Sequence, residues 1–198
     1  MDDYFAVFGL PRKLGVDLEA LQRRFYELSR QHHPDFHQQA AEAGQAAALE
    51  SSALVNRAYR ALRDPLSRVE YLIALEEGRE TKEGGAARPK APRDLLEEML
   101  DVQEALQEAK TGGLEDTSRL WLSDERRRLI EQREAVERLL IGAFPEWDRA
   151  VDSGGDRKPL LKRFKEALAE RAYLGTVIDD LGDALGESEE GHVPHRRH

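Results

Sequence analysis

The sequence contains no cysteine, and only 7% of its 198 residues are aromatic. Without cysteine the chain has no disulfide bond, no thiolate metal site and no cysteine nucleophile. No segment approaches the roughly 18 consecutive apolar residues of a membrane-spanning helix. These absences exclude several classes of enzyme and argue against a membrane partner.

Signals for β-strands, phosphate-binding loops and nucleophile elbows are also missing. Residues 1–4 have neither the positive charge nor the apolar run of a secretory signal, and they are too acidic for a mitochondrial presequence. We therefore expect a cytoplasmic protein that performs no covalent chemistry.

The chain is rich in charged residues, which make up 35% of it, and 40% of its residues are hydrophobic. This balance suits helices that bury one face and expose the other, in one or two domains. The formal net charge of -9 argues against a general nucleic-acid binder, although a local basic patch remains compatible with it.

Residues 17–62 predict two helices joined by a turn. The first has Asp17 as its N-cap and an apolar stripe that comprises Leu18, Leu21, Phe25 and Leu28. The second has a matching stripe that comprises Ala48, Ser52, Val55, Tyr59 and Leu62. Pro34 ends the first helix, because proline cannot continue a helix and restricts the residue before it. The two stripes predict an antiparallel helical hairpin.

The tripeptide His33-Pro34-Asp35 falls between these helices, where we expect an exposed loop. A residue followed by Pro-Asp is also ordinary turn chemistry, so the tripeptide alone does not assign a function. The neighbouring helix strengthens a functional interpretation of the tripeptide. The face opposite its apolar stripe is charged and carries Arg23, Arg24, Glu27 and Arg30.

Together these features resemble a J-domain, the ATPase-stimulating module of DnaJ-class co-chaperones. The resemblance includes the run that closes the second helix, Asn56-Arg57-Ala58-Tyr59-Arg60-Ala61-Leu62-Arg63-Asp64-Pro65. Residues 3–11 and 67–72 are more narrowly similar to the HscB family, the J-proteins of iron–sulfur cluster assembly. The similarity is near-continuous through residue 76 and looser beyond it.

The resemblance implies a partner chaperone of the HscA or DnaK type, whose ATP hydrolysis supplies the energy. The residues that it assigns to chaperone binding are His33, Pro34, Asp35, Arg23, Arg24, Arg30 and Asn56. It implies no cofactor and no enzymatic activity of the chain itself.

The second half of the sequence predicts three more helices. Their apolar stripes comprise Leu95, Met99, Val102 and Leu106; then Leu122, Leu129, Val136 and Leu140; then Leu160, Phe164, Ala167, Leu174, Ile178, Leu181 and Leu185. The last stripe is interrupted by Arg171. Residues 144–155 predict an irregular or briefly helical insert before it.

The predicted fold is therefore all-α, with a J-domain at 1–77 and an antiparallel three-helix bundle at 93–186. Residues 78–92 are rich in glycine, proline and charge, which indicates a linker. The acidic and histidine-containing residues 187–198 indicate a disordered tail.

Two leucines of the first bundle helix, Leu96 and Leu100, lie away from its stripe. Their neighbours are acidic: Glu97, Asp101, Glu104 and Glu108. Tyr173 similarly lies outside the last stripe. Surface leucines are common, so the pattern fits either plain solvation or a docking face. The resemblance implies that these seven residues bind the cluster scaffold protein IscU, although Glu97 stands where family members commonly have an apolar residue.

Histidines suggest a metal site, since His33 and His37 are four residues apart and the tail contains His192, His195 and His198. Pro34 breaks the helix that such a pair needs, so no metal is expected. The alternatives that the sequence leaves open are a J-protein with another client, a purely structural helical adaptor and a histidine-dependent metalloenzyme.

Overall fold

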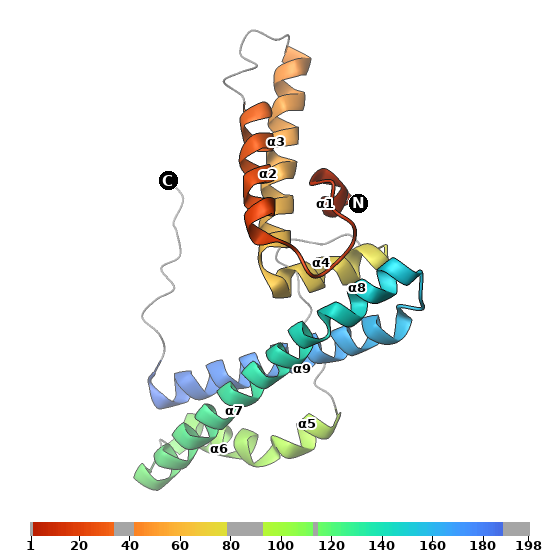
Figure 1. Ribbon diagram of the computed structural model, residues 1–198. Coiled ribbons are helices and arrows are strands. Elements are labelled where there is room, and N and C mark those ends of the chain that lie inside the picture. The colour runs from red at the N-terminus through yellow and green to blue at the C-terminus, as the bar shows by residue number, and fades with distance from the viewer. Residues whose placement is uncertain (1, 34–41, 79–92, 113–114, 188–198) are drawn as a thin grey trace. The chain divides into compact units, whose positions relative to one another are not determined.

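A computed structural model describes residues 2–33, 42–78, 93–112 and 115–187 (Figure 1). All regular secondary structure in these ranges is helical, which confirms the all-α prediction. The helices are α1 Tyr4–Val7, α2 Leu18–Gln31, α3 Glu42–Arg63, α4 Pro65–Glu76, α5 Arg93–Glu98, α6 Leu100–Gly112, α7 Asp116–Gly142, α8 Phe144–Ser153 and α9 Lys158–Leu185. None of the helices in these ranges is long and apolar enough to cross a membrane.

Aspartates cap the amino-terminal ends of α1, α2 and α4. The Asp17 carboxylate accepts a hydrogen bond from the Ala20 amide at 3.0 Å, which confirms the predicted N-cap of α2. Asp64 caps α4 in the same way, accepting from the Ser67 amide at 2.8 Å. Pro65 follows as the first residue of α4, where a missing N–H costs nothing.

The chain forms two compact units: Met1–Gly85 with Leu140–Lys165, and Ala86–Leu139 with Glu166–His198. The long helices α7 and α9 each contribute to both. This grouping differs from the predicted domains, because residues 140–165 pack with the amino-terminal part. The predicted limits of 1–77 and 93–186 stay a prediction, and residues 79–92 and 188–198 lie outside the described ranges.

In the first unit, α2 and α3 lie side by side as an antiparallel hairpin (Figure 1). The Phe25 and Tyr59 rings stack across it with centroids 4.1 Å apart, and Leu21, Leu28 and Val55 are buried. Leu18, predicted to belong to the apolar stripe of α2, is 51% exposed. Helical side chains lean toward the amino terminus, so the first residue of α2 projects beyond the helix instead of onto it.

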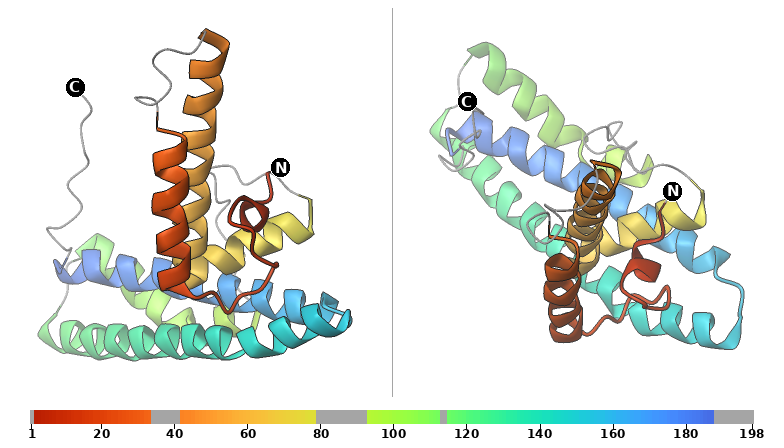
Figure 2. Two further views of the ribbon diagram at one scale, coloured as in Figure 1. Left: turned by 45° about the horizontal axis from the view of Figure 1, so that its top comes forward. Right: turned by 90° about the horizontal axis from the view of Figure 1, so that it is seen from above.

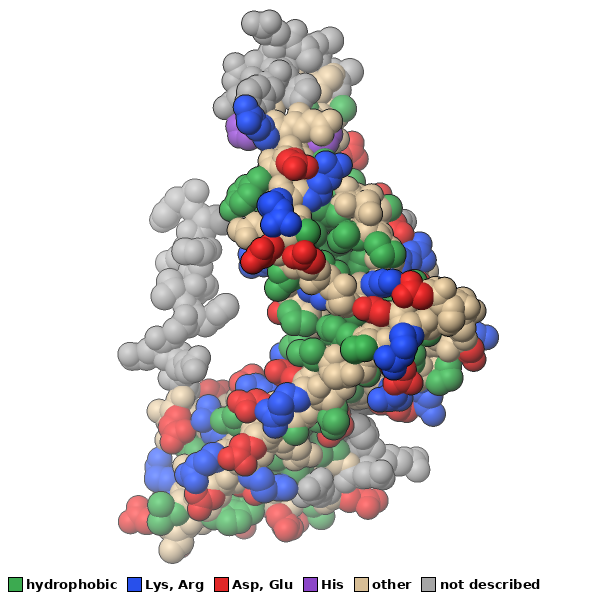
Figure 3. All heavy atoms as spheres, in the orientation of Figure 1, with side chains coloured by type: hydrophobic (Ala, Val, Ile, Leu, Met, Phe, Trp, Pro, Cys, Tyr) green, Lys and Arg blue, Asp and Glu red, His purple; other side chains and the backbone are tan. Residues whose placement is uncertain are grey.

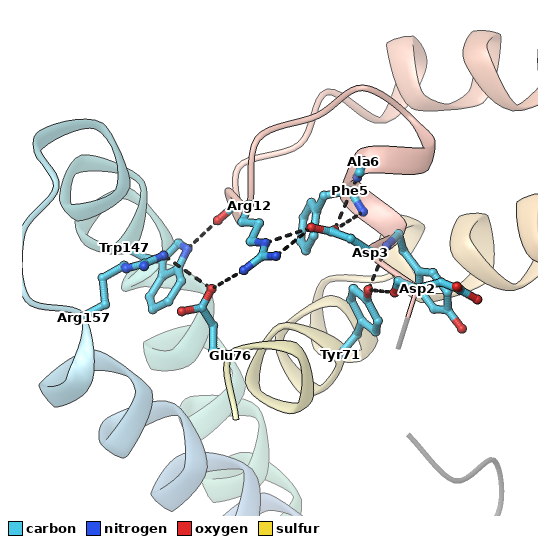
Figure 4. Close-up of polar contacts among 10 residues, drawn as sticks. Asp2, Asp3, Phe5, Ala6, Arg12, Tyr71, Glu76, Trp147 and Arg157 are labelled. Atoms are coloured by element: carbon cyan, nitrogen blue, oxygen red, sulfur yellow. Dashed lines mark hydrogen bonds and ion pairs between the residues drawn. The ribbon is translucent and has the colours of Figure 1, made fainter. Parts of the chain in front are cut away.

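The predicted insert is the regular helix α8, which belongs to the core of the first unit. It ends at Gly154, whose φ of 66° is the left-handed conformation that glycine adopts without strain. Trp147 on α8 is fully buried beside Phe164, and its indole Nε1 donates a hydrogen bond to the Arg12 carbonyl oxygen at 2.8 Å (Figure 4). Of the two predicted forms, irregular and briefly helical, the helical one is correct.

Glu76, at the end of α4, joins two segments of the first unit (Figure 4). Its carboxylate lies 3.3 Å from the Arg12 guanidinium and 3.4 Å from that of Arg157. Burial alone would lower the pKa of Arg12, but hydrogen bonds and charge from Asp3 and Glu76 outweigh it and raise that pKa. Arg12 therefore stays charged. The Arg157 guanidinium also lies 5.4 Å from the Trp147 ring centroid.

Arg68 on α4 is a buried charge satisfied by main-chain oxygens. Its guanidinium donates hydrogen bonds to the carbonyls of Leu62, Arg63 and Leu14. Burial lowers the pKa of Arg68, an effect that the charges of Asp64 and Asp148 oppose. The side chain thus ties the end of α3 to the loop that leads into α2.

In the second unit, α9 lies between α6 and α7 (Figure 2, right). The buried side chains are Leu95, Met99, Val102, Leu106, Leu122, Leu129, Val136, Leu174, Val177, Ile178, Leu181 and Leu185. All but Val177 belong to the predicted stripes. The other members of those stripes differ, because Leu140, Leu160 and Phe164 belong to the first unit and Ala167 is only partly buried. Arg171, which interrupts the last stripe, forms an ion pair with Glu137 of α7 at 2.6 Å. The three-helix bundle is confirmed, with its first helix divided at Met99 into α5 and α6.

Candidate functional site

The end of α2 presents His33 to solvent. The helix stops at Gln31, and the His32 amide donates to the Leu28 carbonyl at 3.0 Å as the C-cap. This ending agrees with the predicted effect of Pro34. Pro34 and Asp35 themselves lie outside the described residues, so their arrangement stays a prediction.

The predicted basic face of α2 carries charges of both signs (Figure 3). Arg23 lies 3.7 Å from Glu19, and Arg24 lies 2.9 Å from Glu27. Such exposed pairs are worth less than about 1 kcal/mol, so a partner can compete for either arginine. Arg30 is also exposed, and no ion pair within the described ranges involves it.

Asn56 lies on the outer surface of α3. Its side-chain amide donates a hydrogen bond to the Ser52 carbonyl of the same helix at 2.9 Å. The residue is exposed, so a partner can reach the side chain. One N–H of the amide is used toward Ser52, which leaves its second N–H and its oxygen for a partner.

Leu96 and Leu100 form an exposed apolar pair on α5 and α6, as predicted. Their side chains are 43% and 59% exposed, whereas the residues that directly precede them, Leu95 and Met99, are buried. Four carboxylates accompany the pair and are likewise exposed: Glu97, Asp101, Glu104 and Glu108. We call this set the leucine face.

Tyr173 departs from the prediction, because it is only partly exposed and packs against the core of the second unit. Its phenolic oxygen accepts a hydrogen bond from the Gln103 side chain at 3.0 Å. Gln103 belongs to α6, so the structure brings Tyr173 of α9 beside the helix that carries most of the leucine face. The ring lies at the edge of the α9 stripe, and this position lets it reach both the core and α6.

Two exposed aromatic side chains were missed by the sequence analysis. Tyr26 on α2 is 61% exposed and lies between the exposed Arg23 and Arg30 along the helix, and its hydroxyl accepts a hydrogen bond from Gln22. Trp121 on α7 is exposed beside Leu120. Projection of each helix onto a wheel would have placed both outside the apolar stripes.

Among the described residues, no group of three or more His, Asp or Glu side chains is arranged to hold a metal ion. His37 and the tail residues His192, His195 and His198 lie outside those residues. The structure therefore leaves the predicted absence of a metal site as a prediction.

Comparison with known proteins agrees with this geometry. Residues 3–71 match the family model of the DnaJ domain. The solved chaperone HscB from Vibrio cholerae is 25% identical, with a TM-score of 0.51, and the match covers 91% of this chain and 99% of that one. Human co-chaperone protein HscB shares the fold at 23% identity, with a TM-score of 0.60 over 91% of this chain and 81% of that one. Residues 3–71 are therefore a DnaJ domain, and the chain has the architecture of an HscB-type J-domain co-chaperone.

Proposed function

We propose that this protein stimulates the ATPase of an HscA- or DnaK-type chaperone and delivers the iron–sulfur scaffold protein IscU to it. The observation that carries the proposal is an exposed His33 at the end of α2, inside a DnaJ domain and in a chain with HscB architecture. In this proposal the chain performs no covalent chemistry, and the chaperone hydrolyses the ATP.

The chaperone half of the proposal rests on electrostatic recognition. Arg23, Arg24 and Arg30 are exposed on one helix that ends next to His33. Exposed charges speed the encounter with an oppositely charged surface and orient the partner. His33, Pro34 and Asp35 would then supply a short, specific contact at the end of that helix.

The client half rests on the leucine face. An apolar pair surrounded by carboxylates suits a partner surface that has an apolar centre and a basic or polar rim. Tyr173 lies beside α6 and offers an aromatic edge to the same partner. The assignment of IscU as that partner comes from the resemblance to the HscB family.

A second client class is favoured by one feature, the exposed Glu97 within the leucine face. A carboxylate where HscB relatives commonly have an apolar residue would favour a more basic client. Binding of purified IscU, compared with that of a basic protein of similar size, separates the two candidates.

The proposal is tested by single-turnover ATP hydrolysis with the cognate chaperone. We expect wild-type protein to stimulate hydrolysis several-fold and His33→Gln to abolish the stimulation. His32→Gln is the matched control, because it changes a neighbouring histidine by the same substitution. Equal stimulation by His33→Gln and wild type, with matching circular dichroism spectra, would refute the chaperone half.

A further inference from the structure

The first unit contains a hollow of about 360 Å³ that belongs to neither surface described above. It is lined by residues of α1, α3 and α4, among them Tyr4, Arg57, Arg60, Ser67, Glu70 and Tyr71. Arg57 and Arg60 lie about 22 and 27 Å along α3 from its first residue. The hollow is thus far along α3 from the end that follows the His33 loop.

One wall of the hollow is a rigid aromatic pair. The Tyr4 and Tyr71 rings stack with centroids 4.3 Å apart and an interplanar angle of 10°. The Tyr71 hydroxyl donates to the Asp2 carbonyl at 2.7 Å and accepts from the Tyr4 amide at 2.8 Å. Burial raises the pKa of Tyr71 to about 12, so the phenol stays neutral and does not repel an anion.

The other wall carries two arginines one helical turn apart. No ion pair within the described ranges involves Arg57 or Arg60, whereas Arg12 and Arg157 of the same unit both contact Glu76. Glu70 lines the hollow and has an interaction of its own. Asp3, whose charge acts on Tyr71, pairs with Arg12 at 2.9 Å, and Asp64 is occupied as the cap of α4. The arginine pair therefore creates a locally basic site on a chain of net charge -9.

We propose that this hollow binds an acidic segment of a partner protein. Arg57 and Arg60 would hold a carboxylate, because the guanidinium fork matches carboxylate oxygens bidentately. An adjacent apolar side chain of the segment would pack against the half-buried Tyr4 ring. An apolar wall beside two cations favours such a mixed peptide over a small inorganic anion, which would gain nothing from the ring.

The test uses the full chain and a defined probe, a short fluorescein-labelled peptide of alternating Glu and Leu. A Gln-and-Leu peptide of the same length removes the charge and keeps the apolar side chains. Fluorescence anisotropy gives the affinity of each. We expect the Glu peptide to bind and the Gln peptide to bind at least about tenfold more weakly, a difference of about 1.4 kcal/mol.

The site is located by two glutamine double variants of equal net charge, together with a lysine double variant that keeps the charge of the wild type. Arg57→Gln with Arg60→Gln should weaken Glu-peptide binding about tenfold, and Arg57→Lys with Arg60→Lys should restore only part of it, because lysine lacks the fork. Arg127→Gln with Arg138→Gln is the control, since those arginines are 68% and 69% exposed on α7. Binding that is equal for the two peptides, or lost equally in the two glutamine variants, would overturn the proposal. Chaperone stimulation is measured separately, so failure here leaves the His33 test unaffected.

Discussion

The Asp148 carboxylate accepts a hydrogen bond from the Leu14 amide at 2.7 Å, although the two residues are 134 positions apart. The same carboxylate accepts from the Gly15 amide at 2.9 Å, and Arg68 donates to the Leu14 carbonyl. A Cβ atom at Gly15 would lie only 2.6 Å from the Asp148 carboxylate, so a larger residue there would have to displace that carboxylate. Helix α8 therefore holds the loop that leads into α2, the helix that ends next to His33.

Asp148→Ala should lower the free energy of unfolding by about 1–3 kcal/mol, because it leaves the amide of the fully buried Leu14 without a partner. For a chain of this size that corresponds to a fall in Tm of roughly 2–4 °C per kcal/mol. Asp152→Ala is the matched control, since Asp152 is exposed and forms a surface ion pair with Lys13. Equal melting temperatures for the two variants would show that α8 does not anchor the loop.

The cap of α4 should make stability depend on pH. Burial alone would raise the pKa of Asp64, but hydrogen bonds from Ser67 and Leu66 and the charge of Arg68 outweigh it and lower that pKa. A carboxyl whose folded pKa lies below its unfolded value of about 3.9 stabilises the fold above that pH. This stability is lost as the pH falls through the folded pKa.

Asp64→Asn keeps a good N-cap but cannot ionise. The wild type should therefore be the more stable protein near neutral pH, and its advantage should shrink as the pH falls below about 4. Urea midpoints of both proteins, measured across that range, give the comparison. A difference that stays constant with pH would contradict the role of the ionised carboxylate.

Arg30 should contribute more to chaperone binding than Arg24, because Arg24 already pairs with Glu27 at 2.9 Å. Arg30→Gln is expected to weaken binding several-fold, and Arg24→Gln to weaken it less. The affinity of the wild type should also fall as salt rises through the physiological range, where the screening length is about 8 Å. Titration calorimetry at several salt concentrations measures both effects. An affinity that does not change with salt would show that the exposed arginines of α2 do not contact the chaperone.

Tyr173 should matter for stability as well as for client binding, unlike the exposed leucines. Tyr173→Ala removes a ring that packs on the core, so a loss of about 1–3 kcal/mol is expected. Tyr173→Phe removes only the exposed bond to Gln103 and should cost less than about 1 kcal/mol. If the ring anchors the client, Phe should retain most of the IscU binding that Ala loses, and equal binding by both variants would exclude such an anchor.

The periodic features of this chain could be read from the sequence. Asp17 as a cap, the paired stripes of α2 and α3 and the leucine face all follow from residues within one helix. Local spacing determines which face of a helix is apolar, and this information lies within a few turns. The structure confirmed the exposure of Leu96 and Leu100 for that reason.

Contacts between distant segments could not be read in the same way. The buried Trp147 donates a hydrogen bond to the main chain of Arg12, 135 positions away. The buried Arg68 donates hydrogen bonds to three main-chain oxygens. In the sequence, Arg68 is one more charged residue and Trp147 lies in a stretch interrupted by proline and glycine. Only the tertiary structure brings their partners together.

The central claim is that one chain couples a client to a chaperone, and single-turnover ATP hydrolysis in the presence of IscU tests it most directly. Wild-type protein should give greater stimulation with IscU than without it. The double variant Leu96→Ala with Leu100→Ala should lose that IscU-dependent increase, since exposed apolar anchors are worth about 1–2 kcal/mol each. Its melting temperature should stay close to that of the wild type, because both side chains are exposed. An IscU-dependent increase that is undiminished in a folded double variant would contradict the account.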